Sequence, residues 1–313
     1  MIRIKGTGAG RRILSAVLSI FILFVSFTFV GCDFQLPTPI QLEQGDDNIH
    51  LPIIYAGDEM VIHFIDVGQG DCSLVQGGGV NILIDSGENG MGTVVVEYLE
   101  KIGVSKLHWI IGSHPHSDHI GGIDTVIKSV EVDNLMLPVV DESLTPVTST
   151  YSDVLDAAEE YDVSLTMAKA GDFYEFDGMM MEILSPDTQF NYSDLNDCSL
   201  VVRFSVNGFS YLTTGDISSS VERDILENGY DVSADVLKLA HHGSSTSSSW
   251  AFLKRSAPQY AVVSCGFDND YGHPHDIVID RLNELDITIV RRDRLGNVVF
   301  TYKEGAVDVA AVD

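Results

Sequence analysis

The chain has 313 residues, of which 18 are Lys or Arg and 46 are Asp or Glu, so its formal net charge is −28. Hydrophobic residues make up 45% of the sequence, which is enough for a sizeable core and excludes a largely disordered chain. A polyanion of this kind repels nucleic acid and anionic membranes unless cations intervene. A DNA-binding protein with a basic groove is therefore disfavoured.

The N-terminus has the pattern of a bacterial export signal. A basic start at residues 3–12 precedes an apolar run at residues 13–30. Residues 29–32, Phe-Val-Gly-Cys, resemble a lipobox, in which Cys32 is lipidated and becomes the first residue of the mature chain. We therefore expect a lipoprotein signal peptide at residues 1–31 and a lipid anchor at Cys32. An uncleaved membrane anchor or an ordinary signal peptide is the alternative.

Each of these signals places the rest of the chain outside the cytoplasm, at the bacterial cell surface. Cleavage before Cys32 leaves 14 basic residues (18 minus 4) against 46 acidic ones, a formal charge of −32. It also leaves three cysteines, Cys72, Cys198 and Cys265. Because this number is odd and no CxxC pair occurs, we expect buried small side chains, not a disulfide framework or a cysteine-bound zinc ion.

Two further segments follow the signal. Residues 32–59 contain three prolines and no sustained periodicity, which predicts a tether. Residues 60–313 are predicted to form one α/β domain, in which helices cover two packed sheets. Strands are predicted at residues 61–67, 72–76, 80–85, 108–111, 134–137, 198–206, 211–214, 236–240, 260–264, 288–291 and 297–302, with three or four more between 165 and 184. Helices are predicted at residues 93–102, 122–129, 151–161, 219–228, 248–256 and 277–285.

The most informative segment is Ser113-His-Pro-His-Ser-Asp-His119, which directly follows the predicted strand at residues 108–111. Loops at the carboxyl ends of strands are where α/β scaffolds present ligands. Imidazole and carboxylate groups suit a divalent cation. The first two histidines can face one side of the loop and the Asp-His pair the other, so one loop can serve two metal ions. These side chains are His114, His116, Asp118 and His119.

Two other predicted strands also end in polar residues. The strand at 211–214 runs into Gly215-Asp216, and the strand at 236–240 runs into His241-His242. Together with the first loop they bring five histidines and two aspartates to strand ends, enough for a full ligand set of four histidines and two aspartates. This combination predicts a metal site.

The order of these motifs resembles the metallo-β-lactamase fold superfamily, and most closely the extracellular hydrolase domain of ComEC-type DNA-uptake proteins and stand-alone secreted relatives. The resemblance covers about residues 60–302 and implies a four-layer αββα sandwich with a two-metal site at one edge. It rests on Phe64-Ile-Asp-Val-Gly-Gln-Gly-Asp71, Leu83-Ile-Asp-Ser-Gly87, His114-x-His-x-Asp-His119, Asn196-Asp-x-Ser199, Leu212-x-Thr-Gly-Asp216, His241-His-Gly-Ser244 and Tyr271-Gly-His-Pro274.

The resemblance implies a metal role for six side chains, which would hold two divalent ions, zinc or manganese. The first ion would take His114 and His116, the second would take Asp118, His119 and His241, and Asp216 would bridge the two. Many superfamily members supply one more histidine to the first ion, and this chain has Asn196 and Asp197 at that place. We favour a position left open to water or substrate, and Asp197 as a ligand is the alternative.

Further residues are expected to support the centre or to take part in catalysis. Those predicted to orient the metal ligands or the loops are Asp66, Asp71, Asp85, Asn196 and Asp197. Those predicted to act in catalysis, by binding the phosphate or assisting the leaving group, are Asp118, His242, Ser244 and His273. His273 could instead fix a turn. The basic cluster at residues 291–294 could contact a phosphate chain, although a solvated turn is the favoured interpretation.

The predicted function is an extracytoplasmic metal-dependent phosphodiesterase or nuclease, in which a hydroxide bridging two metal ions attacks phosphorus in line. The ComEC resemblance favours DNA as substrate. The negative charge favours a cell-wall phosphodiester instead, as for phosphorylcholine esterases of the same superfamily. A non-catalytic surface module is disfavoured because the ligand set is intact. A β-lactam or thioester hydrolase is disfavoured because the extra histidine is missing.

Overall fold

The computed structural model describes residues 57–189 and 192–312. The chain divides into two units, Met1–Leu36 and Pro37–Asp313, and every described residue belongs to the second. The predicted signal peptide, Cys32 and most of the predicted tether lie outside the described residues. Within the described ranges, no helix has the length and apolar character needed to span a membrane.

Two mixed sheets form the centre of the domain. The first has the strand order β15 (Ala306–Val312), β14 (Asn297–Lys303), β1 (Met60–Phe64), β2 (Ser73–Gly77), β3 (Val80–Ile84), β4 (Lys106–Ile111), β5 (Glu131–Pro138) and β6 (Ser164–Ala168). The second has the order β13 (Thr288–Arg291), β12 (Tyr260–Val263), β11 (Val236–Lys238), β10 (Phe209–Thr213), β9 (Val201–Val206), β8 (Met179–Ser185) and β7 (Phe173–Phe176).

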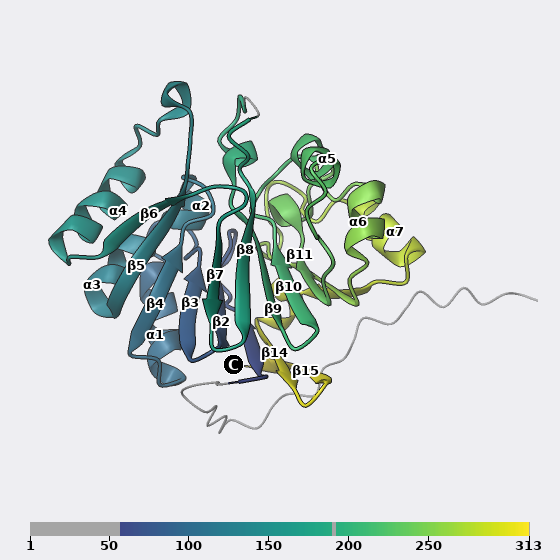
Figure 1. Cartoon of the computed structure of the whole chain (residues 1–313), viewed down its shortest axis with the longest axis horizontal. Coiled ribbons are helices and arrows are strands. Elements are labelled where there is room, and N and C mark those ends of the chain that lie inside the picture. Colours follow the sequence, from purple (N-terminus) through teal and green to yellow (C-terminus); the bar gives the residue numbers. More distant parts are fainter. Residues whose placement is uncertain (1–56, 190–191, 313) are drawn as a thin grey trace, which may run out of the picture. The chain divides into compact units, whose positions relative to one another are not determined.

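Helices cover the outer face of each sheet. The first sheet carries α1 (Gly92–Lys101), α3 (Ile123–Ser129) and α4 (Ser149–Glu160), and the second carries α5 (Ser219–Glu227), α6 (Trp250–Ser256) and α7 (Asp276–Glu284). Figure 1 shows these two helix sets on opposite sides of the sheets. Shorter elements are α2 (Ser117–Ile120), α8 (Arg292–Leu295) and the 3₁₀ turns η1 (Glu142–Leu144), η2 (Asn196–Cys198) and η3 (Ala240–Gly243). The predicted four-layer αββα arrangement is confirmed.

Buried aromatic residues join the two sheets at the centre of the sandwich. The ring of Phe64 in β1 meets Tyr211 of β10 edge-on, with a centroid distance of 5.6 Å, and Phe300 of β14 at 5.7 Å. Phe204 of β9 stacks on the same Tyr211. Alternating side chains of both inner faces fill this layer, because successive residues of a strand point to opposite faces.

Parallel strand pairs bring the functional loops to one edge of the sandwich. β3 and β4 run parallel in the first sheet, and β10 and β11 run parallel in the second. The histidine-rich loop follows β4, Gly215-Asp216 follows β10, and His241-His242 follows β11. The carboxyl ends of these strands therefore present all three motifs together.

Several elements differ from the prediction. β1 ends at Phe64, before the predicted end at residue 67, and α8 was not predicted. β11 ends at Lys238, because His241 and His242 adopt left-handed backbone angles in η3. β9 begins at Val201, because η2 precedes it. β15 was not predicted, and it extends the first sheet by antiparallel pairing with β14. The three described cysteines are free and buried, as predicted.

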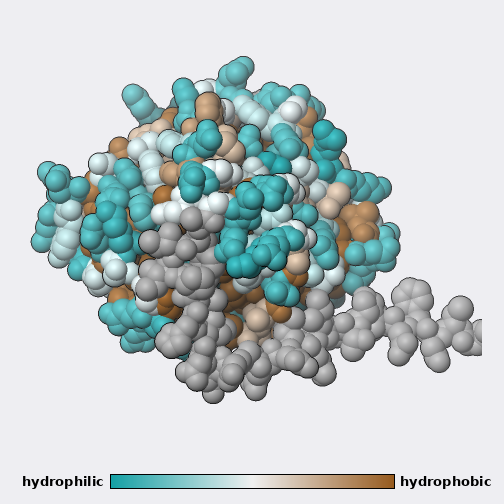
Figure 2. Space-filling view, turned by 60° about the horizontal axis from the view of Figure 1, so that its bottom comes forward, coloured by the Kyte–Doolittle hydropathy of each residue, from teal (hydrophilic) through white to brown (hydrophobic). Residues whose placement is uncertain are grey.

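The surface reflects the acidic composition of the chain. Figure 2 shows one face of the molecule, on which hydrophilic residues occupy most of the coloured surface. Cationic side chains in the described ranges are largely committed to carboxylates, as in the Lys106 pairs with Glu131 and Asp133. These exposed pairs contribute little to stability, so their main effect is on surface charge.

Candidate metal centre

Asp85 fixes the histidine-rich loop at the end of β4. This residue follows β3, and its carboxylate accepts hydrogen bonds from the backbone N and the Oγ of Ser113, both at 2.7 Å. It also accepts a hydrogen bond from Nδ1 of His119 at 2.8 Å. With Nδ1 of His119 held in this way, its Nε2 atom faces Oδ1 of Asp216 at 3.3 Å and Oδ2 of Asp118 at 3.8 Å.

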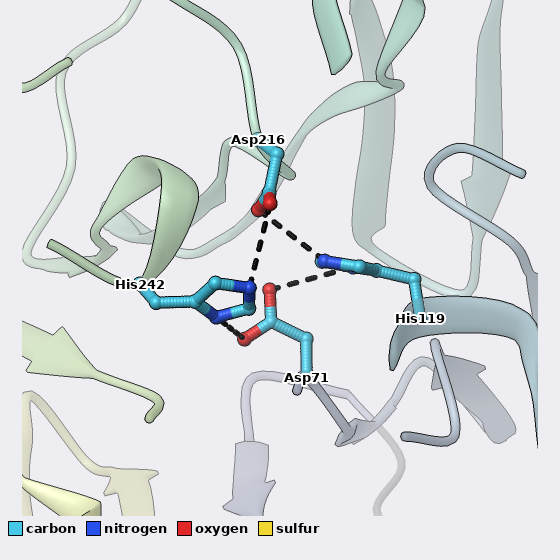
Figure 3. A group of neighbouring side chains, drawn as sticks. All are labelled: Asp71, His119, Asp216 and His242. Carbon is cyan, nitrogen blue, oxygen red and sulfur yellow. Dashed lines mark ion pairs between the residues drawn. The ribbon is translucent and has the colours of Figure 1, made fainter. Parts of the chain in front are cut away.

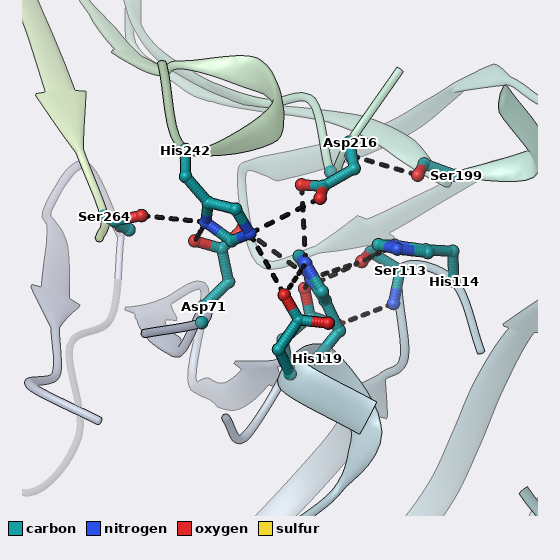
Figure 4. A network of polar contacts seen from close by, with 12 residues as sticks. Asp71, Ser113, His114, His119, Ser199, Asp216, His242 and Ser264 are labelled. Carbon is teal, nitrogen blue, oxygen red and sulfur yellow. Dashed lines mark hydrogen bonds and ion pairs between the residues drawn. The ribbon is translucent and has the colours of Figure 1, made fainter. Parts of the chain in front are cut away.

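His242 approaches the same carboxylates from the second sheet. Its Nδ1 atom donates to the carbonyl oxygen of Ser264 at 2.8 Å. Its Nε2 atom therefore points inward, to Oδ2 of Asp118 at 3.2 Å and Oδ2 of Asp216 at 3.4 Å. The Nε2 atoms of His119 and His242 thus converge on two carboxylates, which is a suitable donor set for a divalent cation. Figure 4 shows this network and the residues that brace it.

His241 occupies a different position from its neighbour. Its side chain is 29% exposed, its Nε2 atom lies 3.8 Å from Oδ2 of Asp216, and its Nδ1 atom lies 3.4 Å from Oγ1 of Thr246. Both histidines have positive φ angles, 51° for His241 and 55° for His242, which direct their side chains apart. The contacts favour His242 over His241 as the ligand shared with His119, while His241 as a ligand stays a prediction.

His114 and His116 lie together beside this group. Nε2 of His114 is 3.1 Å from Nδ1 of His116, and the ring of His114 lies 4.1 Å from that of His119. Burial holds the pKa of His114 well below its usual value, so that its imidazole is neutral, which is the form that binds metals. The role of this pair in holding a first metal stays a prediction.

Asp71 lies on the opposite side of the two inner histidines. Its Oδ2 atom is 3.6 Å from Nδ1 of His119, and its Oδ1 atom is 3.6 Å from Nδ1 of His242. Asp71, His119, Asp216 and His242 are all buried, and each offers one ligand atom within 4.8 Å of the others (Figure 3). Asp71 thus contacts both histidines on their Nδ1 sides, and its expected role in orienting them stays a prediction.

The polar atoms at this position fit a cation. Nε2 of His119 and Oδ1 of Asp216 are buried and have no hydrogen-bond partner among the described residues, whereas Asp71 pairs with Lys238. Buried polar atoms are normally satisfied, so this concentration of unsatisfied nitrogen and oxygen atoms requires an explanation. A divalent ion held by the Nε2 atoms and the carboxylates of Asp118 and Asp216 would supply it.

The electrostatics of the group also favour a bound cation. Although burial opposes ionisation, His242 and His119 hold the pKa of Asp216 well below its ordinary value. Although burial lowers both values, Asp216 and Asp85 raise the pKa of His119 well above normal. Asp216 and Asp71 do the same for the pKa of His242. The carboxylates thus attract positive charge, which either protons or a metal can provide.

Other predicted residues serve the loops. Asp66 accepts hydrogen bonds from Gly68 and Arg292 and so shapes the loop that leads to Asp71. Asp197 accepts a hydrogen bond from the backbone N of Ser218 at 3.0 Å, at the start of α5. The Ser199 hydroxyl donates a hydrogen bond to the backbone carbonyl oxygen of Asn196. The same hydroxyl accepts a hydrogen bond from the backbone N of Asp216 at 3.0 Å.

The two remaining catalytic candidates differ in their access to the centre. The Oγ atom of Ser244 accepts a hydrogen bond from Oγ1 of Thr246 at 3.0 Å and lies inside its own turn. The ring of His273 lies 6.0 Å from that of His242, and its Nδ1 atom is buried without a partner among the described residues. Burial and the neighbouring His242 lower the pKa of His273 to about 4, so this ring is neutral near pH 7.

Lys238 is a buried residue of the centre that sequence reasoning missed. It is the last residue of β11 and its side chain is 3% exposed. Its ammonium group pairs with Asp71 and donates to the carbonyl oxygen of Gly215 at 3.0 Å. The signal in the sequence was a single lysine inside the apolar run Val236–Ala240, because a lysine is rarely buried unless its charge is paired.

The fold and this site define a class of protein. The sequence matches the family model of the metallo-beta-lactamase superfamily over residues 65–178, and the described residues form a metallo-beta-lactamase fold domain. The structure is similar to Igni18, a metallo hydrolase from the hyperthermophilic archaeon Ignicoccus hospitalis, with a TM-score of 0.50 and 15% identity over 78% of this chain and 100% of that one. This likeness concerns the fold.

The most informative relatives by sequence are competence proteins of the ComEC type. The chain is 30% identical to ComE operon protein 3 of Bacillus subtilis (strain 168), over 77% of this chain and 33% of that protein. It is 32% identical to the competence protein ComA of Neisseria gonorrhoeae, over 80% of this chain and 33% of that protein. The match thus spans one third of the length of each relative.

Proposed function

We propose that this domain is an extracytoplasmic metal-dependent phosphodiesterase, and that its substrate is a nucleic acid. The observation that carries the proposal is the convergence of the Nε2 atoms of His119 and His242 on the carboxylates of Asp118 and Asp216 at one buried edge. The similarity to competence proteins supports a nucleic-acid substrate. Lipid anchoring through Cys32 would place this activity at the cell surface.

The chain's own residues prepare the centre for this chemistry. A divalent cation, zinc or manganese, would activate water and neutralise charge on a phosphoryl oxygen when bound here. Asp85 and the Ser264 carbonyl hold the Nδ1 protons of His119 and His242, so that both Nε2 atoms are free to bind metal. Asp216 faces both histidines and is suited to bridge two ions, with His114 and His116 beside the first.

A loop next to the centre, at residues 266–273, carries exposed aromatic rings. Asn269 closes this loop by donating to the carbonyl oxygens of Gly266 and His273 at 2.9 and 2.7 Å. Tyr271 is 65% exposed and stacks on His273, with ring centroids 5.7 Å apart, and Phe267 is 79% exposed. Aromatic side chains beside a phosphodiester site can stack on nucleobases.

The proposal is tested with two oligonucleotides of the same length, one with normal bases and one with abasic residues. Metal-loaded protein should cleave the normal single strand and bind it more tightly than the abasic one. Tyr271→Ala should remove this difference in affinity, whereas Tyr161→Ala, which alters an exposed tyrosine in another part of the domain, should not. Absence of cleavage of either strand, with bound metal verified, would contradict the proposal.

A cell-wall phosphodiester is the second candidate substrate. The formal charge of −28 favours it, because a long DNA strand would meet repulsion over most of the protein surface. Incubation of the metal-loaded protein with a choline phosphodiester, in parallel with the oligonucleotides, separates the two candidates. Cleavage of the choline ester alone would favour the cell-wall substrate.

A further inference from the structure

Lys238 occupies an unusual position for a lysine. Its side chain is almost fully buried, and its Nζ atom lies directly behind the metal centre. It donates to the Gly215 carbonyl oxygen at 3.0 Å, pairs with Oδ2 of Asp71, and lies 3.8 Å from Oδ1 of Asp216. Lysine is rarely fully buried unless its charge is compensated, so these contacts account for its presence.

These contacts join three segments that carry the centre. Asp71 lies in the loop between β1 and β2, and Gly215 precedes Asp216 in the loop after β10. Lys238 itself ends β11, and the chain runs on from there into His242. One ammonium group thus connects both sheets directly beneath the histidines.

The charges of the centre are divided between two sides. The Nε2 atoms of His119 and His242 face Asp118 and Asp216, whereas their Nδ1 sides face Asp71. A small cavity of about 10 Å³, near the size of one water molecule, lies on the Asp71 side and is lined in part by Lys238. The cation that faces the Asp71 carboxylate is the Lys238 ammonium group, which is separate from any ion on the Nε2 side.

We propose that Lys238 is a positioning residue that serves as a fixed internal cation for Asp71. Its ammonium group compensates the charge of the Asp71 carboxylate and keeps it behind the two histidines. The divalent ion is then bound on the Nε2 side alone, and Asp71 is not one of its ligands. This inference rests on the metal centre of the proposed function and not on the proposed substrate.

The test compares Mn²⁺ affinity in two single variants, measured by isothermal titration calorimetry and by electron paramagnetic resonance. Asp71→Asn leaves the ammonium uncompensated beside the centre, so Mn²⁺ should bind about tenfold more weakly. Lys238→Met leaves an uncompensated carboxylate, so Mn²⁺ should bind at least as tightly as in the wild type. If the Asp71–Lys238 pair had a purely structural role, both variants would bind Mn²⁺ more weakly. Opposite changes in Mn²⁺ affinity therefore distinguish charge compensation from a structural role.

The double variant Asp71→Asn/Lys238→Met completes the test. Removal of both charges should restore Mn²⁺ affinity to within about threefold of the wild type. In the absence of metal, Lys238→Met should lower the melting temperature, and the double variant should recover most of that loss. Lys106→Met, which removes an exposed lysine of the first sheet, is the matched control and should change neither quantity.

Two results would overturn the inference. One is a double variant that binds Mn²⁺ as weakly as Asp71→Asn, since Asp71 would then be a metal ligand. The other is weaker binding in Lys238→Met. If instead the signs are as expected but the wild type cleaves no phosphodiester, the proposed function fails and the role of Lys238 stands.

Discussion

Nδ1 of His119 donates to Oδ2 of Asp85 across 2.8 Å, and this contact fixes the direction in which the histidine binds. Asp85 is itself held in a left-handed conformation, with φ of 58°, and accepts two further hydrogen bonds from Ser113. The carboxylate therefore connects the end of β3 to the histidine-rich loop. It sets the orientation of the ligand without facing the metal side.

Loss of this carboxylate should weaken the metal centre. Asp85→Ala frees the His119 ring to rotate, and residues that orient metal ligands typically contribute 10–100-fold to metal affinity. We expect a loss of about that size in Mn²⁺ affinity by calorimetry. Asp124→Ala, which removes a carboxylate from the surface helix α3, serves as control. Unchanged affinity in Asp85→Ala would show that His119 is not a ligand.

The adjacent histidines should respond unequally to substitution. His242→Ala removes an Nε2 atom that lies 3.2 Å from Asp118 and 3.4 Å from Asp216, so metal content should fall to half or less. His241→Ala removes a partly exposed ring 3.8 Å from Asp216 and should have the smaller effect. Metal content by plasma mass spectrometry decides the matter. The reverse order of effects would assign the ligand role to His241.

Metal removal should destabilise the folded domain. A ligand present at 100 times its Kd stabilises a protein by about 2.7 kcal/mol, provided that it binds only the folded state. Here the metal would also relieve repulsion between Asp118 and Asp216. Treatment with a chelator should therefore lower the melting temperature by several degrees, and added Zn²⁺ or Mn²⁺ should restore it. A melting temperature that is independent of metal would argue against occupancy of this centre.

His63 should make the domain sensitive to acid. Burial lowers the pKa of this histidine to about 4, against an opposing effect of Gln76, from an ordinary value near 6.5. Because the unfolded chain binds the proton more readily, His63 contributes stability that is present above pH 6.5 and lost as the pH falls to about 4. The expected loss is about 3 kcal/mol over this interval.

The acid effect is measured as a difference between two proteins. His63→Gln should show a shallower decline in unfolding free energy between pH 6.5 and 4 than the wild type, both followed by urea denaturation after metal removal. The comparison cancels contributions of the histidines of the metal centre. Parallel pH profiles would show that His63 does not titrate in this way.

Arg292 should matter more for folding than its neighbours in the basic cluster. It is completely buried and donates to the carbonyl oxygens of Gly70 and Cys265 at 3.2 and 3.1 Å, as well as to Asp66. The Asp66 side chain is 44% exposed, so the loss falls mainly on the carbonyl oxygens of Gly70 and Cys265, which would lose their donor at a cost of about 2–6 kcal/mol together. Arg292→Met should lower the unfolding free energy by about that amount, and Arg294→Met by less than about 0.5 kcal/mol. Equal effects would contradict this account.

The interpretation of residues 291–294 as a solvated turn is thus wrong for Arg292. Arg291 pairs with Asp293, in keeping with a local turn, whereas Arg292 reaches back to the loop that follows β1. Lys238 is a comparable case, since its partner Asp71 is distant in sequence. Sequence patterns report local spacing well, but they do not reveal which distant carboxylate or carbonyl will compensate a buried charge.

The layer order and the edge that bears the site were predictable from short-range signals. Polar residues directly after the apolar strands β4, β10 and β11 indicated where the chemistry would lie, because parallel strands end at a common edge. The choice between His241 and His242 was not predictable in this way. It depends on two consecutive left-handed residues, which direct the second imidazole inward and leave the first partly exposed.

The most direct test of the proposed metal centre is anomalous X-ray scattering from crystals grown with Mn²⁺ or Zn²⁺. We expect a peak within coordination distance of Nε2 of His119, Nε2 of His242 and the carboxylate of Asp216, and a second peak, where two ions bind, beside His114 and His116. The absence of any peak at these atoms in crystals of metal-loaded protein, or a peak confined to another part of the surface, would contradict the central claim.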